Sequence, residues 1–193
     1  MVLHNKGDKV RKHLGIINKE ICLANEIISN LLDFSRVKPP QCSSVDLNDL
    51  IDETLAECYI PRHVKLNKKL AGNLPLIFVD RSQVQRALLN IITNAVQAMP
   101  EGGQLKLESK VDDKAITIAI ADTGLGIPKE NLKRIFQPLF TTKTTGVGLG
   151  LTVSKSLLEA NNGKIYVRSK VGKGTTFYLK FKLGTQLLTS SNN

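Results

Sequence analysis

Four short blocks of polar, glycine and aromatic residues follow one another through the middle of this chain. They occupy residues 90–95, 122–126, 136–140 and 146–151. Any one of them alone is weak evidence, because short motifs recur by chance. Four in series within the length of one domain indicate a shared binding pocket, and they restrict the chain to folds that can assemble it.

The segments around these blocks alternate between helix and strand patterns. Residues 46–59 and 80–99 have helical periodicity, opened by Asp46 and by Asp80 or Ser82. A further helix and six strands are predicted at 151–160 and at 64–69, 76–79, 105–111, 115–121, 165–169 and 175–183. The expected fold class is α/β, a two-layer sandwich in which helices cover one face of a mixed sheet.

A different pattern precedes this unit. Apolar residues recur there in alternating steps of four and three, which is the repeat of a coiled coil or helical bundle. The stripe consists of Val10, Leu14, Ile17, Ile21, Ala24, Ile28, Leu31 and Ser35. We interpret it as one helix of a dimerising four-helix bundle, and the alternative is an amphipathic helix that lies on its own domain.

Two prolines, Pro39 and Pro40, end this helix, because proline disfavours helix in the residue before it. We therefore divide the chain into four parts. They are a partial bundle at 1–36, a linker at 37–44, the main α/β domain at 45–183 and a polar, frayed tail at 184–193.

Composition limits the class of partner. The formal net charge is +10, but the lysines are scattered and the chain has only three Tyr and six Phe for base stacking. We therefore disfavour nucleic acid, and a nucleotide or an acidic protein partner fits the charge as well. No apolar run approaches the roughly 20 residues that cross a bilayer. Cys22, Cys42 and Cys58 lack metal-ligand spacing and are interpreted as reduced cytosolic thiols.

Side chains in the first two blocks suggest a chemistry. Asn90 and Asn94 are one helical turn apart and share a face, and an amide oxygen is a suitable magnesium ligand. Asp122 ends a predicted strand, where its carboxylate can accept a hydrogen bond from the amine of adenine. Gly124 and Gly126 allow the backbone to approach the ring. The alternatives are solvated asparagines and an ordinary Asp-Thr-Gly turn.

Glycines in the fourth block precede the helix at 151–160. A glycine-rich loop at a helix N-terminus presents backbone N–H groups to phosphate. The loop is neither a Walker nor a Rossmann motif, because no Gly-Lys-Ser/Thr is present and Gly146 does not follow a strand.

The stretch at 141–145 is short and polar, and we interpret it as a lid whose Lys143 reaches phosphate. Phe136 and Phe140 lie on one side of it. They are expected to anchor the lid, and simple packing in the core is compatible with that role.

In this order the blocks resemble the N, G1, F and G2 boxes of the Bergerat-type ATP-binding domain, and residues 172–175 resemble its G3 box. Sensor histidine kinases, DNA gyrase, MutL and a heat-shock chaperone share that domain. The short lid and the sequence at 31–36, Leu-Leu-Asp-Phe-Ser-Arg, resemble the histidine kinases in particular. The second feature is similar to the end of the second helix of their dimerisation and phosphotransfer domain.

The resemblance covers residues 45–183 and implies ATP and Mg²⁺ as ligands. It implies that Asn94 binds magnesium and that Asp122 recognises adenine. The expected catalytic residues are Asn90, Asn94 and Lys143. The expected ATP-binding residues are Asn94, Gln97, Asp122, Gly124, Gly126, Ile127, Phe136, Phe140, Thr141, Thr142, Lys143, Gly146, Gly148, Leu149, Gly150, Leu151 and Thr175.

Two residues depart from the superfamily pattern. Its ATPases carry a glutamate one turn before the magnesium asparagine, and Asn90 occupies that place here. Because an amide cannot act as a general base, this favours phosphoryl transfer over hydrolysis. A lysine or histidine often follows the magnesium asparagine by three residues. Gln97 stands there instead, which leaves more of the phosphate contact to Lys143.

The phosphoacceptor histidine is a larger departure. His4, His13 and His63 all lack the acidic residue that follows that histidine in the family. We therefore expect that the first bundle helix is absent, and that the full protein has an upstream sensing region that can include membrane helices.

The expected function is the ATP-binding catalytic part of a sensor histidine kinase. It would transfer the γ-phosphoryl group of Mg-ATP to a histidine on a bundle helix outside this chain, for onward transfer to a response-regulator aspartate. The expected partners are a second copy through helix 10–35 and a receiver domain, with no nucleic acid. This portion would be cytoplasmic, with any membrane contact made elsewhere. The alternatives are a nucleotide-binding regulatory module, a Bergerat-type ATPase or a serine kinase of the anti-sigma type.

Overall fold

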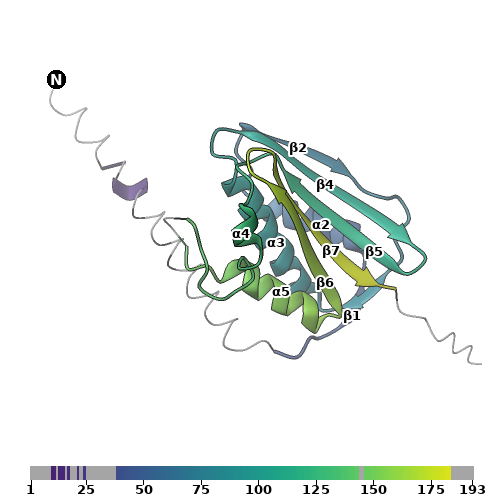
Figure 1. Ribbon diagram of the computed structural model, residues 1–193. Coiled ribbons are helices and arrows are strands. Elements are labelled where there is room, and N and C mark those ends of the chain that lie inside the picture. Colours follow the sequence, from purple (N-terminus) through teal and green to yellow (C-terminus); the bar gives the residue numbers. More distant parts are fainter. Residues whose placement is uncertain are drawn as a thin grey trace, which may run out of the picture.

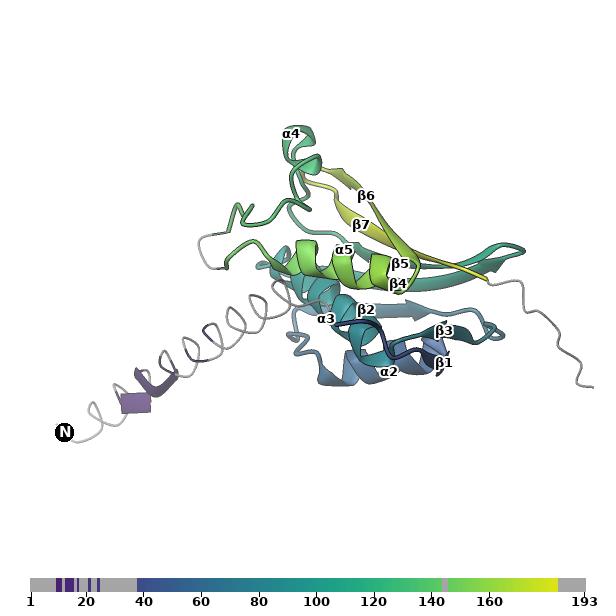
Figure 2. The same cartoon turned by 90° about the horizontal axis from the view of Figure 1, so that it is seen from below.

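The computed structural model describes residues 38–143 and 146–183, together with residues 10, 11, 13–15, 17, 21 and 24. The main part has two layers, as the sequence predicts (Figures 1 and 2). One is a five-stranded sheet. The other consists of helices α2 (Leu47–Glu57), α3 (Arg81–Gln97) and α5 (Gly150–Ala160), which cover one face of it. This confirms the α/β sandwich.

The sheet is mixed, and its strand order is β2-β4-β5-β7-β6. β2 runs parallel to β4, and the other neighbouring pairs are antiparallel. The strands are β2 (Val64–Lys69), β4 (Gly103–Asp112), β5 (Ala115–Asp122), β6 (Gly163–Lys170) and β7 (Gly174–Lys182). All five were predicted from apolar alternation, with ends that differ by a few residues.

The core lies between the sheet and the helices. In β5, Ile116, Ile118 and Ile120 alternate with half-buried residues and are fully buried, because successive side chains of a strand point to opposite faces. Leu88 and Ile92 of α3 belong to the same cluster of buried side chains. This packing fixes the side of α3 that faces the sheet and leaves its polar stripe toward α5.

Carboxylates cap the first two of these helices. Asp46 accepts hydrogen bonds from the N–H groups of Asn48 and Asp49 at the start of α2. Asp80 accepts from the N–H of Gln83 at the start of α3. Asp46 was predicted as an N-cap, and Asp80 was one of two candidates, with Ser82, for the start of α3. By contrast, the N-cap residue of α5, Leu149, makes no side-chain hydrogen bond to the start of its helix.

Three short elements complete the fold. β1 (Ser43–Val45) and β3 (Ile77–Val79) form a separate antiparallel pair, and α4 (Lys129–Leu132) is a single turn before the lid. β1 and α4 were not predicted. β1 begins at Ser43, inside the segment that the sequence analysis treats as linker.

The predicted N-terminal helix lies largely outside the described residues, as does the tail at 184–193. The described positions of the apolar stripe are helical, and their side chains are 53–60% exposed. These values belong to Val10, Leu14, Ile17 and Ile21, and Ala24, the fifth described position of the stripe, is also helical and exposed.

Candidate functional site

The first and fourth sequence blocks meet where α3 passes the start of α5. The Nδ2 group of Asn90 donates a hydrogen bond to the carbonyl oxygen of Gly150 at 3.4 Å. A Cβ on Gly150 would lie 3.9 Å from the amide carbon of Asn90 and 4.0 Å from Nδ2 of Asn94. Two asparagine amides thus lie against the first residue of a helix, as the spacing of Asn90 and Asn94 predicts.

The lid reaches the same stripe of α3 through Lys143. Its ammonium group donates hydrogen bonds to Oδ1 of Asn94 and to Oε1 of Gln97, both at 2.5 Å. A cation therefore already lies on the amide oxygen that the sequence analysis assigns to magnesium. The contact with Gln97 was not predicted. The signal available in the sequence was the missing positive charge at position 97.

The second block places a carboxylate at the end of β5. Asp122 is only 6% exposed, and its Oδ1 accepts hydrogen bonds from the N–H groups of Gly124 and Thr175. Burial raises the pKa of Asp122 above its ordinary value, although these hydrogen bonds oppose the shift. Among the described residues nothing donates to Oδ2, so this oxygen is left for a ligand.

The bond from Gly124 also forms the turn that was the alternative interpretation of this block. The turn and a ligand site are compatible, because they use different oxygens of Asp122.

Glycines let three backbone segments close around this carboxylate. Gly174 has a φ of 99°, and a Cβ there would lie 1.9 Å from the carbonyl oxygen of Asp122. A Cβ on Gly124 would lie 2.2 Å from the carbonyl oxygen of Ala98, at the end of α3. Because Cβ atoms essentially never approach backbone so closely, only glycine fits at either position.

Ser169 ties the loop after Asp122 to the β6–β7 hairpin. The N–H of Ile127 donates to the hydroxyl of Ser169 at 2.7 Å, and that hydroxyl donates to the carbonyl oxygen of Gly174 at 3.0 Å. The hydroxyl oxygen of Thr175 is 2.9 Å from the hydroxyl oxygen of Ser169. Ser169 was not singled out from the sequence. Its role depends on its place opposite Thr175 in the hairpin.

The third block packs against the core and supports the glycine loop. Phe136 and Phe140 are half-buried and contact the core cluster. The hydroxyl of Thr152 in α5 donates to the carbonyl oxygen of Phe136 at 3.2 Å. Gly148 has a φ of 70°, and a Cβ there would lie 2.5 Å from the carbonyl oxygen of Phe140. Core packing and lid support are thus combined in the same two phenylalanines.

The start of α5 offers backbone donors to a ligand. The first N–H groups of any helix lack an acceptor within the helix, and the N-cap residue here, Leu149, has no side-chain acceptor to supply one. Leu149 is buried, and the half-buried Leu151 packs against the core. Gly146, Thr141, Thr142 and Lys143 are exposed beside it, and residues 144 and 145 lie outside the described part.

The described residues contain no group of three or more His, Cys, Asp or Glu side chains arranged to hold a metal ion. None of the described helices has the length and apolar character needed to span a bilayer.

The geometry therefore combines a buried carboxylate, two amides and a free helix N-terminus in one place. The chain belongs to the family described as histidine kinase-, DNA gyrase B- and HSP90-like ATPases, whose model matches residues 79–185. It is 37% identical over 180 residues to the signal transduction histidine-protein kinase AtoS of Escherichia coli K12. That alignment covers 91% of this chain and 30% of AtoS.

Solved structures agree with this assignment. Full-length ShkA in complex with AMPPNP is 26% identical with a TM-score of 0.74, over 89% of this chain and 38% of that one. Histidine kinase ThkA in complex with the response regulator TrrA is 25% identical with a TM-score of 0.74, over 90% of this chain and 51% of ThkA. The chain thus corresponds to the ATP-binding catalytic part of these kinases and spans about a third to half of their length.

Proposed function

We propose that this chain binds Mg-ATP and delivers its γ-phosphoryl group to a histidine presented by a helical bundle outside the chain. The observation that carries the proposal is the convergence of Asp122, Asn94 and the uncapped start of α5. These groups would supply a base-recognising acceptor, a metal ligand and a phosphate cradle along one path.

Adenine would lie against Oδ2 of Asp122, which is buried and has no donor among the described residues. The amine of adenine donates to this oxygen while the amides of Gly124 and Thr175 hold the other one. Gly124, Gly126 and Ile127 would flank the ring. The phosphates would take the N–H groups at the start of α5, because a helix N-terminus favours anions.

Asn94 would hold the magnesium ion through Oδ1. The position fits a cation, because the ammonium of Lys143 donates a hydrogen bond to the same oxygen in this structure. A bound magnesium ion would neutralise phosphate charge. Lys143 would then move from Asn94 to the phosphates, and Phe136 and Phe140, which both precede the lid in the chain, would anchor it at that end.

In the transfer itself the bond between the γ-phosphorus and the β–γ bridging oxygen breaks. A bond from the γ-phosphorus to a histidine nitrogen forms, and ADP leaves. Asn90 supports transfer over hydrolysis, since its amide is occupied with the carbonyl oxygen of Gly150 and cannot take a proton from water. The same proposal includes two protein partners. One is a second copy of the chain, which binds through helix 10–35, and the other is the receiver domain of a response regulator. It also places this portion of the protein in the cytoplasm.

A fluorescent ATP analogue tests the nucleotide site. We expect binding that requires Mg²⁺, disappears with EDTA and weakens strongly in Asp122→Ala. Lys173→Ala is the matched control, because Lys173 is exposed in the nearby β6–β7 turn and makes none of these contacts. Binding that ignores both magnesium and Asp122 would refute the site.

Labelled ATP and a separately produced bundle domain with its histidine test the transfer. Label on that histidine supports a kinase. Tight binding with no label favours the regulatory module, and rapid release of free phosphate favours an ATPase.

A further inference from the structure

The sheet has a second face, opposite the helices, and that face is strongly basic. Strand register assigns each outward position, because paired residues share a face. Nine outward residues are cationic and two are acidic, a net formal charge of +7 out of +10 for the chain. The cations are Lys65, Lys69, Lys106, Lys110, Lys164, Arg168, Lys170, Lys180 and Lys182, and the acids are Glu108 and Asp112.

Most of this positive charge is not balanced by acidic residues of the sheet. Lys164 and Lys180 lie directly opposite each other on β6 and β7, an arrangement that costs stability. Among the described outward residues only Lys106 forms an ion pair, with Glu108 at 2.9 Å. Asp112 accepts backbone hydrogen bonds in its own turn. The excess charge therefore calls for a partner outside the sheet.

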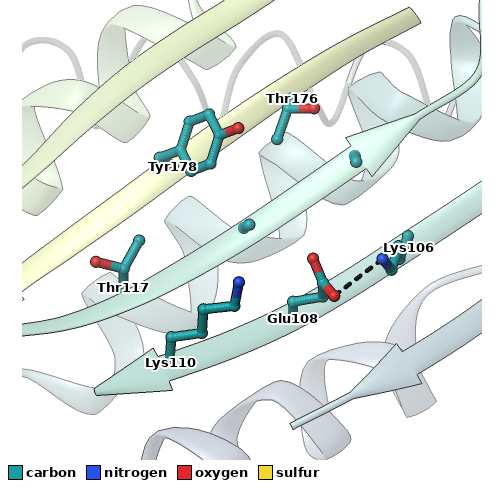
Figure 3. Close-up of a pocket in the computed structure, with 8 residues that line it drawn as sticks. Lys106, Glu108, Lys110, Thr117, Thr176 and Tyr178 are labelled. Carbon is teal, nitrogen blue, oxygen red and sulfur yellow. Dashed lines mark ion pairs between the residues drawn. The ribbon is translucent and has the colours of Figure 1, made fainter. Parts of the chain in front are cut away.

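A shallow hollow of about 270 Å³ lies in the middle of the face. Figure 3 shows Lys106, Glu108 and Lys110 along β4 on one side of it, and Thr176 and Tyr178 along β7 on the other. Its floor is formed by small residues of β5, Ala119 and Ala121, which face Glu108 and Lys106. Protein–protein interfaces commonly have an apolar centre surrounded by a polar or charged rim, and this hollow has the same arrangement.

We propose that this face docks an acidic protein surface that inserts one apolar side chain into the hollow. Charge complementarity selects an anionic partner. The guanidinium carbon of Arg168 lies 5.7 Å from the centroid of the Tyr178 ring. Because the guanidinium occupies that face of the ring, stacking of a nucleic-acid base on it is disfavoured. A planar lipid surface would leave the hollow unfilled. The proposal is independent of nucleotide binding, because Asn94 and Gly150 lie in the helical layer.

Two acidic peptides serve as probes, one rich in Glu with a central Leu and one with Ser in its place. Each is titrated into the ¹⁵N-labelled chain at about 150 mM salt, where long-range attraction is largely screened. We expect shifts on the outward residues of β4, β5 and β7, and binding about fivefold tighter for the Leu peptide.

Two variants distinguish the contribution of the hollow to peptide binding from the contribution of the charge. Ala119→Ile fills the floor without changing charge, and it should remove the advantage of the Leu peptide while leaving the Ser peptide unchanged. Lys110→Glu with Lys180→Glu should weaken both peptides about tenfold or more. Lys129→Glu with Lys133→Glu, in and after α4, changes the net charge equally and should have less than about a twofold effect. ATP-analogue binding checks that every variant is folded.

Several results would overturn the proposal. They are peptide shifts confined to α3 and α5, equal weakening by the two charge-reversal pairs, and an Ala119→Ile variant that still prefers the Leu peptide. A single-stranded oligonucleotide or phosphatidylglycerol vesicles that bind this face more tightly than the Leu peptide would also overturn it and identify a different class of partner.

Discussion

The ammonium group of Lys143 donates a hydrogen bond to the amide oxygen of Gln97 at 2.5 Å, although the two residues are 46 positions apart. The lid thus brings a positive charge to the position on α3 where the family resemblance leads us to expect a lysine or histidine on the helix itself. Moving the charge back to α3 tests whether its source matters.

Lys143→Ala should weaken Mg-ATP binding about tenfold, because one charge-assisted contact contributes about 1.5–3 kcal/mol. Gln97→Lys in the same chain should restore most of the affinity by supplying the charge from α3. Isothermal titration of the single and double variants measures both effects. Lys129→Ala in α4 is the control. A double variant as weak as Lys143→Ala would contradict this expectation.

Asp122→Asn should raise the stability of the fold while it weakens ATP binding. Burial raises the pKa of Asp122 above 3.8, so the native state holds a proton more tightly than the unfolded chain. The free energy of unfolding therefore falls as the pH rises from 3.8 to the raised pKa of native Asp122. The whole of this loss of stability is present at pH 7. Asn has no charge and can keep both bonds at Oδ1, so its free energy of unfolding at pH 7 should be higher.

The same variant should bind ATP about 10- to 100-fold more weakly, since an NH₂ group would face the amine of adenine. Urea denaturation and nucleotide titration together decide the point. An Asp122→Asn protein with unchanged affinity would show that this carboxylate does not recognise the base.

Gly174→Ala should damage both the fold and the site. Its Cβ would lie 1.9 Å from the carbonyl oxygen of Asp122 at a positive φ, and we expect a loss of about 2–4 kcal/mol in the free energy of unfolding. Gly172→Ala is a matched control. It has a φ of 71° but no atom within 4 Å of the added Cβ, so it should cost only about 1 kcal/mol. Equal losses in thermal or urea denaturation would show that the close contact relaxes freely.

Asp80 should make the free energy of unfolding depend on pH in the acidic range. Burial raises the pKa of this carboxylate, but hydrogen bonds from Ser82, Gln41 and Gln83 outweigh burial and hold the pKa below 3.8. The unfolded chain then binds more protons in this window, so stability falls as pH drops from 3.8 through the lower native value. Asp80→Asn, which keeps the cap, should lack this component, and Asp80→Ala should lose about 1–2 kcal/mol at pH 7. Denaturation curves collected at a series of pH values measure the difference.

The exposed stripe at the N-terminus should drive self-association. Leu14 and Ile21 are 60% and 53% exposed, and apolar surface of this kind is usually covered in a stable assembly. Sedimentation should therefore detect dimers or larger species, and Leu14→Arg with Ile21→Arg should raise the dissociation constant about tenfold or more. A monomer at high concentration would refute the predicted bundle.

Local patterns predicted most of the fold. Residues 115–121 alternate cleanly, and Asp46 and Asp80 precede helical periods, so these elements could be assigned without their neighbours. β1 could not, because three residues form a strand only when β3 pairs with them from more than thirty positions away. α4 has four residues and no side-chain cap, so it lacks the signals that mark a longer helix.

A motif nominates its own residues, as for Asn94 and Asp122, and the binding roles of these two residues stay predictions. The site was not predictable where two motifs meet. Ser169 and Gln97 acquire their contacts from the pairing of β6 with β7 and from the path of the lid. Such contacts depend on three-dimensional register, which local periodicity does not encode.

Helix α5 has consequences beyond binding, because two neighbouring helices carry their own caps and α5 does not. If phosphate is the missing cap, the nucleotide completes the secondary structure of the protein. Amide hydrogen exchange at residues 150–153 would then slow on addition of ATP, and the melting temperature would follow ATP concentration. The order of the first turn of this helix would then report whether the nucleotide site is filled.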